Sequence, residues 1–162
     1  MASEILCEPE ILRDYLVDLL QGKSDLAGAK ILSRKVANLQ SQIEEALARE
    51  GVLILVLIPS LKPKQFQAGR IYCDPASIVI RCTADGIKNK TGKSAFYYAC
   101  RVAALLELHT PPFDFCGEIS ITDMRELNII SSKAEKEDDE DVAGWDVIAQ
   151  TKLSIQPRST TN

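Results

Sequence analysis

A glycine- and lysine-rich segment, residues 86–94, has residue types that could bind a phosphate: Gly-Ile-Lys-Asn-Lys-Thr-Gly-Lys-Ser. In a phosphate-binding loop, glycines free backbone N–H groups to surround the phosphates, and a Lys and a Ser or Thr contact the terminal phosphate and Mg²⁺. The stretch between Gly86 and Gly92 is one residue longer than that pattern requires. Ile87 stands where the first glycine should be, and a β-branched residue resists positive φ. We therefore expect a solvated turn that leads into a helix cap.

Phosphate or nucleotide binding by this segment stays as an alternative function. A second strand that ends in a magnesium-orienting acid is missing unless residues 119–123 supply it, and their polar alternation suits an exposed sheet better. Four side chains are the candidate anion ligands: Lys88, Lys90, Lys93 and Ser94.

The cysteines do not form a recognisable metal or redox motif. They are odd in number, widely spaced and without a C-x-x-C pair, and the chain has one histidine to complete a metal site. We expect reduced, buried thiols at Cys7, Cys73, Cys82, Cys100 and Cys116. The sequence thus predicts no catalytic residue, no metal site, no cofactor and no enzyme activity.

The remaining polar features have simple structural interpretations. The acidic run 135–141 lacks the spacing and glycine of a calcium-binding loop and is expected to be a solvated loop. His109 is expected to cap the C-terminal end of a helix, and Trp145 to pack in the core or an interface at the start of a strand.

Composition indicates a globular, non-membrane protein. The chain has 162 residues, 46% of them hydrophobic and 26% charged, which suits one domain over residues 1–156 with a disordered tail at 157–162. A net charge of −4 argues against sequence-specific nucleic-acid binding. The N-terminus lacks the features of a secretory signal, and the longest apolar run, 52–58, is too short to cross a bilayer. We expect synthesis in the cytoplasm.

Hydrophobic periodicity predicts three helices. The first runs from Pro9 towards Gly22, and the second has an apolar stripe from Leu32 to Leu47 with Gly51 as a left-handed C-cap. Ser94 is expected to cap the third helix, with Phe96 facing the core.

The strands suggest an α+β sandwich. Residues 52–58 have no polar side chains at alternate positions, which predicts a strand covered on both faces. Pro59 and Pro63 are expected to end this strand. Residues 60–74 are expected to form a long loop or an irregular arm. Further strands are predicted at residues 76–83, 113–121 (continuing over 124–130) and 145–155. The fold class is therefore α+β, a mainly antiparallel sheet of about four strands with two to three helices packed on one face.

Several of these elements together resemble a known class of protein. The helix Val36-x-x-Leu39-x-x-x-Ile43-x-x-x-Leu47, the strand that follows Gly51, the alanine-rich third helix and the strand Trp145-Asp146-Val147-Ile148-Ala149-Gln150-Thr151 resemble small prophage tail proteins of the tail-terminator or tail-completion type. The resemblance implies a structural protein that caps a tail tube as an oligomeric ring, through which DNA passes, and that becomes part of a virion.

A ring of identical subunits needs two different contact patches on each subunit. We nominate residues 60–74 and the last strand, predicted as an edge strand that ends near Ile155. The candidate interface residues are Leu61, Phe66, Arg70, Tyr72 and Trp145. If the acidic run pointed into the lumen it would repel DNA, although an outward loop is the simpler expectation. A general protein-interaction domain of a bacterial cell is a further alternative.

Overall fold

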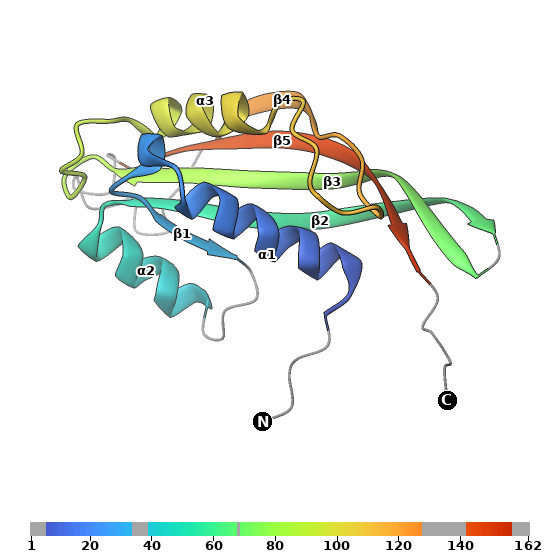
Figure 1. Cartoon of the computed structure of the whole chain (residues 1–162). Coiled ribbons are helices and arrows are strands. Elements are labelled where there is room, and N and C mark those ends of the chain that lie inside the picture. Colours follow the sequence, from blue (N-terminus) through green and yellow to red (C-terminus); the bar gives the residue numbers. More distant parts are fainter. Residues whose placement is uncertain (1–5, 34–38, 68, 128–141, 157–162) are drawn as a thin grey trace.

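A computed structural model describes residues 6–33, 39–67, 69–127 and 142–156, except for the side chains of residues 65–67. These residues form three α-helices, a short 3-10 helix and a five-stranded sheet (Figure 1). The elements in chain order are α1 (Glu8–Gln21), η1 (Ser24–Leu26), β1 (Lys30–Ser33), α2 (Leu39–Arg49), β2 (Val52–Gln67), β3 (Arg70–Asp85), α3 (Ala95–Leu106), β4 (Ser120–Leu127) and β5 (Val142–Ile155).

The sheet is mixed, with the strand order β1-β2-β3-β5-β4. The last strand, β5, was predicted to be an edge strand, but it lies inside the sheet because β3 and β4 pair with it on its two sides. β1 is parallel to β2, and every other neighbouring pair is antiparallel. Parallel neighbours need a crossover connection, which α2 provides here. β2 and β3 form a long hairpin of two 16-residue strands. The predicted α+β class with a mainly antiparallel sheet is therefore confirmed.

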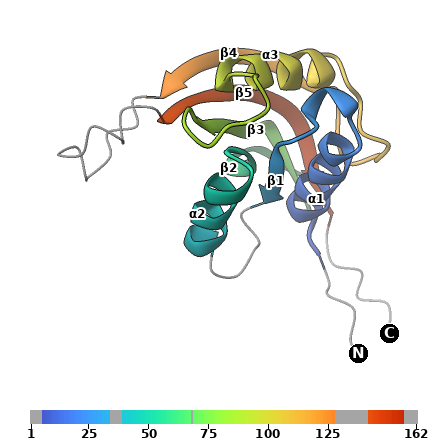
Figure 2. The same cartoon turned by 90° about the vertical axis from the view of Figure 1, so that its left-hand side faces the viewer.

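Helices cover both faces of the sheet, not one face as predicted. On the inner face, Val52, Ile54 and Val56 of β2 share a buried cluster with side chains of α1 and α3. On the outer face, Leu53 and Leu55 pack with Ala46 of α2 in a separate cluster. Figure 2 shows α1 and α2 on opposite sides of the sheet. The crossover from β1 to β2 places α2 on the outer face. This position depends on the strand topology, which the helical periodicity of the sequence does not predict.

The apolar run 52–58 is covered on both faces, as predicted. Val52, Ile54 and Val56 are fully buried, and Leu53 and Leu55 retain 3% and 7% of their exposure. Since α1 and α2 of the same chain supply this cover, these positions need no partner subunit.

The predicted end of this strand at Pro59 and Pro63 was wrong, because β2 continues through both prolines to Gln67. Proline lacks a backbone N–H and is tolerated where a strand has a neighbour on one side only. β1 pairs with β2 only as far as Val56, so the later part of β2 has no described neighbour on that side. Residues 60–74 were predicted as a loop or irregular arm, but the described part of this range, 60–67 and 69–74, is the distal part of the β2–β3 hairpin.

Two element boundaries and the environment of one side chain also differ from the predictions. Leu32, predicted in the second helix, belongs to β1, a strand that was not predicted, and α2 spans Leu39–Arg49. Residues 113–119 carry only an isolated bridge from Cys116 to Leu153, so β4 begins at Ser120. Phe96 was predicted to face the core but is 49% exposed. The predicted helix 9–21, the Ser94 cap and the left-handed Gly51 are confirmed.

In the part of the chain that the structure describes, no helix is long and apolar enough to cross a membrane. The predicted acidic loop 135–141 and the predicted tail 157–162 lie outside the described residues.

Candidate functional site

The segment 86–94 is a compact corner between β3 and α3 in which many backbone amides are already bonded. Oδ1 of Asp85 accepts hydrogen bonds from the amides of Ile87 (3.0 Å) and Lys88 (3.2 Å), and its carbonyl accepts one from Asn89 (2.8 Å). The side-chain oxygen of Asn89 accepts a hydrogen bond from the amide of Thr91, and the hydroxyl of Thr91 accepts one from the amide of Lys93. These amides are therefore unavailable to a phosphate, unlike those of a phosphate-binding loop.

Two glycines explain why this corner folds tightly against the rest of the protein. Gly51 has φ of +75°, and a Cβ there would lie 2.5 Å from backbone atoms of Lys88 and Asn89. Gly28 has φ of +90°, and a Cβ would lie 2.7 Å from Cγ2 of Thr91. The corner thus packs on two backbone segments that only glycine leaves open.

The four candidate anion ligands take up different environments. Ser94 Oγ accepts the amide of Tyr97 at 3.0 Å and caps α3. Lys93 Nζ lies 5.2 Å from the centre of the Tyr97 ring, and Lys88 and Lys90 are exposed. Ser94 thus serves as a helix cap, and Lys93 makes a cation–π contact.

The candidate interface residues divide between the two ends of the hairpin. Arg70 is exposed and Tyr72 half-buried at the distal end, where Leu61 packs against the inner core. Trp145 pairs across strands with Cys82, near the other end of β3, and its ring lies 4.7 Å from that of Phe96. The side chain of Phe66 lies outside the described atoms. The structure therefore brings Arg70 and Tyr72 together and places Trp145 apart from them.

Sequence patterns did not reveal a hollow of about 460 Å³ at the base of the distal hairpin. Strands β2, β3 and β5 and the segment before β4 line it, through Lys64, Tyr72, Cys73, Asp74, Asp114, Phe115, Cys116, Gly117, Lys152, Leu153 and Ser154. Register shifts in β2 and β3, which depend on strand pairing, lie beside this hollow. The sequence signal near it was the pair Pro59 and Pro63, which was interpreted as a strand end, followed by residues 60–74, which were interpreted as a loop or an irregular arm.

An ion pair on the outer face of the sheet was also missed. Arg81 donates from Nε to Oδ1 of Asp146 at 2.9 Å and from Nη2 to Oδ2 at 3.1 Å. The hydrogen bonds to Asp146, followed by its charge, raise the pKa of Arg81 against the opposing effect of burial. The two residues face each other across β3 and β5, a pairing that sequence alone does not fix.

The described cysteines are free thiols. The prediction of buried thiols is confirmed for Cys73, Cys82 and Cys116, while Cys100 is half-buried. The prediction was wrong for Cys7, which is exposed at the N-cap position before α1. Burial, followed by the charges of Asp146 and Cys100, raises the pKa of Cys82 to about 12, and burial also raises the pKa of Cys73 and Cys116. A raised pKa removes the thiolate that nucleophilic chemistry needs.

His109 follows α3, as expected, and its amide bonds to the carbonyl of Leu106 at 3.0 Å. Its Nε2 lies 2.7 Å from the hydroxyl of Tyr15 on α1, so the imidazole joins two elements of the inner layer. Leu108 before it has a left-handed φ of 62° and is 63% exposed.

Within residues 6–33, 39–67, 69–127 and 142–156, no three His, Cys, Asp or Glu side chains cluster closely enough to hold a metal ion. A scan against models of known protein families finds no match, and a search of curated proteins finds no similar sequence.

Proposed function

We propose that the chain is a non-enzymatic assembly subunit of the tail-terminator or tail-completion type, which caps a phage tail tube as an oligomeric ring. The observation that carries the proposal is the distal hairpin, residues 60–67 and 69–74, which we call the arm. Figure 1 shows its tip extending past the ends of α1, α3 and β5. Lys62, Pro63, Lys64 and Arg70 are exposed on it. An exposed arm of this kind suits contact with a neighbouring subunit.

A second patch lies at the opposite end of the hairpin. Phe96 is 49% exposed beside Trp145, and partly exposed aromatic pairs are typical of protein interfaces. Twelve β3 positions separate Arg70 from Cys82, the strand partner of Trp145, which corresponds to roughly 35–40 Å along an extended strand. Two different patches at opposite ends of a subunit are what head-to-tail ring contacts require.

Two sheet edges, β4 and the part of β2 beyond its pairing with β1, favour contacts through side chains over the addition of another strand. On β4, the amide of Ile121 donates a hydrogen bond to Glu107 Oε2 at 2.7 Å. The amide of Met124 donates one to Asp123 Oδ1 at 2.8 Å. On β2, Pro59 and Pro63 have no amide hydrogen to donate. Carboxylates and prolines at edges are common protection against strand pairing.

The test is the size of the purified full-length chain, measured by native mass spectrometry over a range of concentrations. We expect species larger than dimers that become smaller when Lys62 and Arg70 are both changed to Glu. A matched change of Lys23 and Lys30 to Glu alters the net charge equally and should leave the assembly intact. A symmetric dimer as the largest species would argue against a head-to-tail ring.

A further inference from the structure

Irregularities of two strands meet beside the hollow at the base of the arm. β2 shifts register between Leu61 and Pro63 and again between Pro63 and Gln65. β3 shifts against β5 between Cys73 and Ala76, which leaves Asp74 and Pro75 outside the regular pairing. Bulges of this kind turn side chains away from the direction that a regular strand would give them and often lie beside binding sites.

Asp74 lies between two ammonium groups in this hollow. Its Oδ2 is 3.8 Å from Nζ of Lys64 and 3.9 Å from Nζ of Lys152. Both distances exceed hydrogen-bonding range, and the lysine side chains are 69% and 79% exposed. One carboxylate therefore stands opposite two cations, and in the described residues neither cation has a closer acidic partner.

The charge of this end of the molecule differs in sign from that of the whole chain. The arm and the hollow together carry four cations (Lys62, Lys64, Arg70, Lys152) and two carboxylates (Asp74, Asp114). Arg70 and Tyr72 lie on the same face of β3, because alternate strand residues point the same way. The chain as a whole has a net charge of −4. A cationic end on an acidic protein favours an anionic partner.

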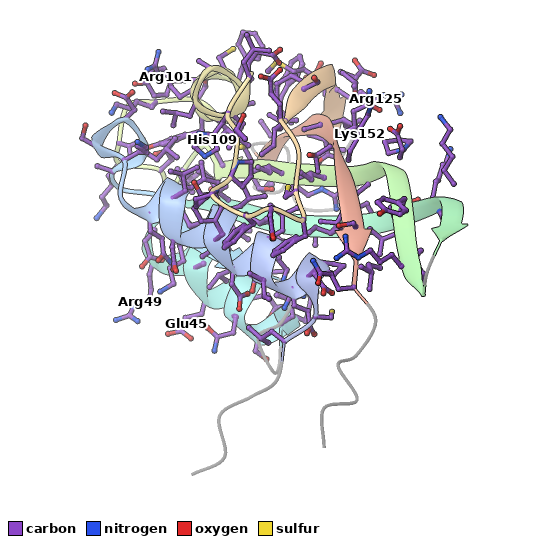
Figure 3. All side chains as sticks on the ribbon, turned by 45° about the vertical axis from the view of Figure 1, so that its right-hand side comes forward. Glu45, Arg49, Arg101, His109, Arg125 and Lys152 are labelled. Carbon is purple, nitrogen blue, oxygen red and sulfur yellow. The ribbon has the colours of Figure 1, made fainter. Side chains whose placement is uncertain are left out.

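The walls of the hollow are partly apolar. Phe115 and Tyr72 are half-buried, and Leu153 beneath them is 2% exposed. Lys152 of β5 lines the same hollow. Figure 3 shows Lys152 on a different part of the molecule from Glu45 and Arg49 of α2. A purely ionic ligand would leave this apolar wall in water, so the occupant needs an apolar side chain next to its carboxylate.

We propose that this hollow binds an acidic peptide segment of a partner protein, with a carboxylate against the exposed ammonium groups of Lys64 and Lys152 and a neighbouring apolar side chain against Phe115. Asp74, which already faces both lysines, and Asp114 oppose the carboxylate and weaken its binding. The inference goes beyond the ring proposal and does not depend on it, because a single subunit contains the whole hollow.

The experiment measures binding of labelled, end-blocked decapeptides to the full-length chain by fluorescence polarisation. One peptide alternates Glu with Leu and Phe, a second has Lys in place of each Glu, and a third has Ser in place of each apolar residue. We expect the first to bind, more weakly as salt rises, and the other two to bind less well.

Three variants locate the site. The double change Lys64→Gln and Lys152→Gln should raise the Kd of the first peptide roughly threefold to tenfold, as expected for two partly solvated ion pairs. Asp114→Asn should lower the Kd. The matched double change Lys23→Gln and Lys30→Gln removes the same charge from exposed positions elsewhere and should leave the Kd unchanged. Circular dichroism confirms that each variant is folded.

Four results would overturn the proposal. The first is that the Glu peptide does not bind, and the second is that the Lys peptide binds as tightly as the Glu peptide. The third is that the Lys23 and Lys30 change raises the Kd as much as the Lys64 and Lys152 change. The fourth is that the Lys64 and Lys152 variant loses self-association while no peptide binds. The last result would assign the hollow to a second copy of this chain.

Discussion

The carboxylate of Asp146 on β5 accepts both the Nε–H and an Nη2–H of Arg81 on β3, at 2.9 and 3.1 Å. The pair lies on the outer face of the sheet, where the Asp146 side chain is only 12% exposed and that of Arg81 is 43% exposed. Two parallel hydrogen bonds between charged groups therefore link β3 and β5 at this point of the sheet.

We predict that Asp146→Asn lowers the free energy of unfolding by about 1–2 kcal/mol, since it replaces a charge-assisted pair that is partly screened by solvent. The double variant with Arg81→Gln should lose less than the sum of the two single losses. Urea unfolding of the four proteins gives this coupling free energy. Additive losses would show that the pair contributes no mutual stabilisation.

Gly51→Ala should destabilise the protein far more than Gly92→Ala. Both glycines have left-handed φ, +75° and +73°, but a Cβ at Gly51 would meet backbone atoms at 2.5 Å whereas one at Gly92 meets nothing within 4 Å. We expect a loss of about 1 kcal/mol for Gly92→Ala, from backbone strain alone. Gly51→Ala should cost more than this, because its Cβ would also displace the 86–94 corner. Equal losses in thermal unfolding would contradict the packing of this corner on Gly51.

The thiols should differ in reactivity. Cys7 is exposed and should react with maleimide within the native protein, whereas the buried Cys73, Cys82 and Cys116 should react only after unfolding. Peptide mapping by mass spectrometry after timed labelling measures each site. Rapid native labelling of Cys82 would contradict its burial.

Alkaline pH should destabilise the fold through Cys82. Its folded-state pKa is raised from 9.0 to about 12, so the folded thiol stays protonated where the unfolded thiol ionises. The stability contribution is complete below pH 9.0 and is lost as the pH rises towards about 12. Chemical unfolding across this window should give a shallower pH dependence for Cys82→Ala than for the unmodified chain. Parallel curves would contradict this assignment.

Nucleotides should not stabilise the protein through the 86–94 corner. The amides of Ile87, Lys88 and Asn89 are held by Asp85, so they are not free to bind phosphate. We expect no change in thermal unfolding on addition of Mg²⁺ with ATP or GTP. A stabilisation that disappears in Lys93→Ala would instead support the phosphate-binding alternative.

Local patterns in the sequence predicted the elements that depend on local physics. The unbroken apolar run at 52–58 correctly indicated a strand buried on both faces, and Ser94 correctly indicated a helix cap. Features set by distant pairing were missed. Pro59 and Pro63 resemble strand terminators, yet a strand edge without a neighbour tolerates them. The Arg81–Asp146 pair and the hollow around Asp74 both arise from the register of β3 against its neighbours.

The most direct test of the assembly proposal mixes two variants that each lack one patch. An arm variant carries Lys62→Glu and Arg70→Glu, and a far-end variant carries Phe96→Ser. In a head-to-tail ring, each variant alone should be a monomer, because its single intact patch meets only a defective one. Native mass spectrometry of the mixture should then show a heterodimer and nothing larger, while the unmodified chain forms closed oligomers. A mixture that stays monomeric, or an unmodified chain that forms only symmetric dimers, would contradict the proposal.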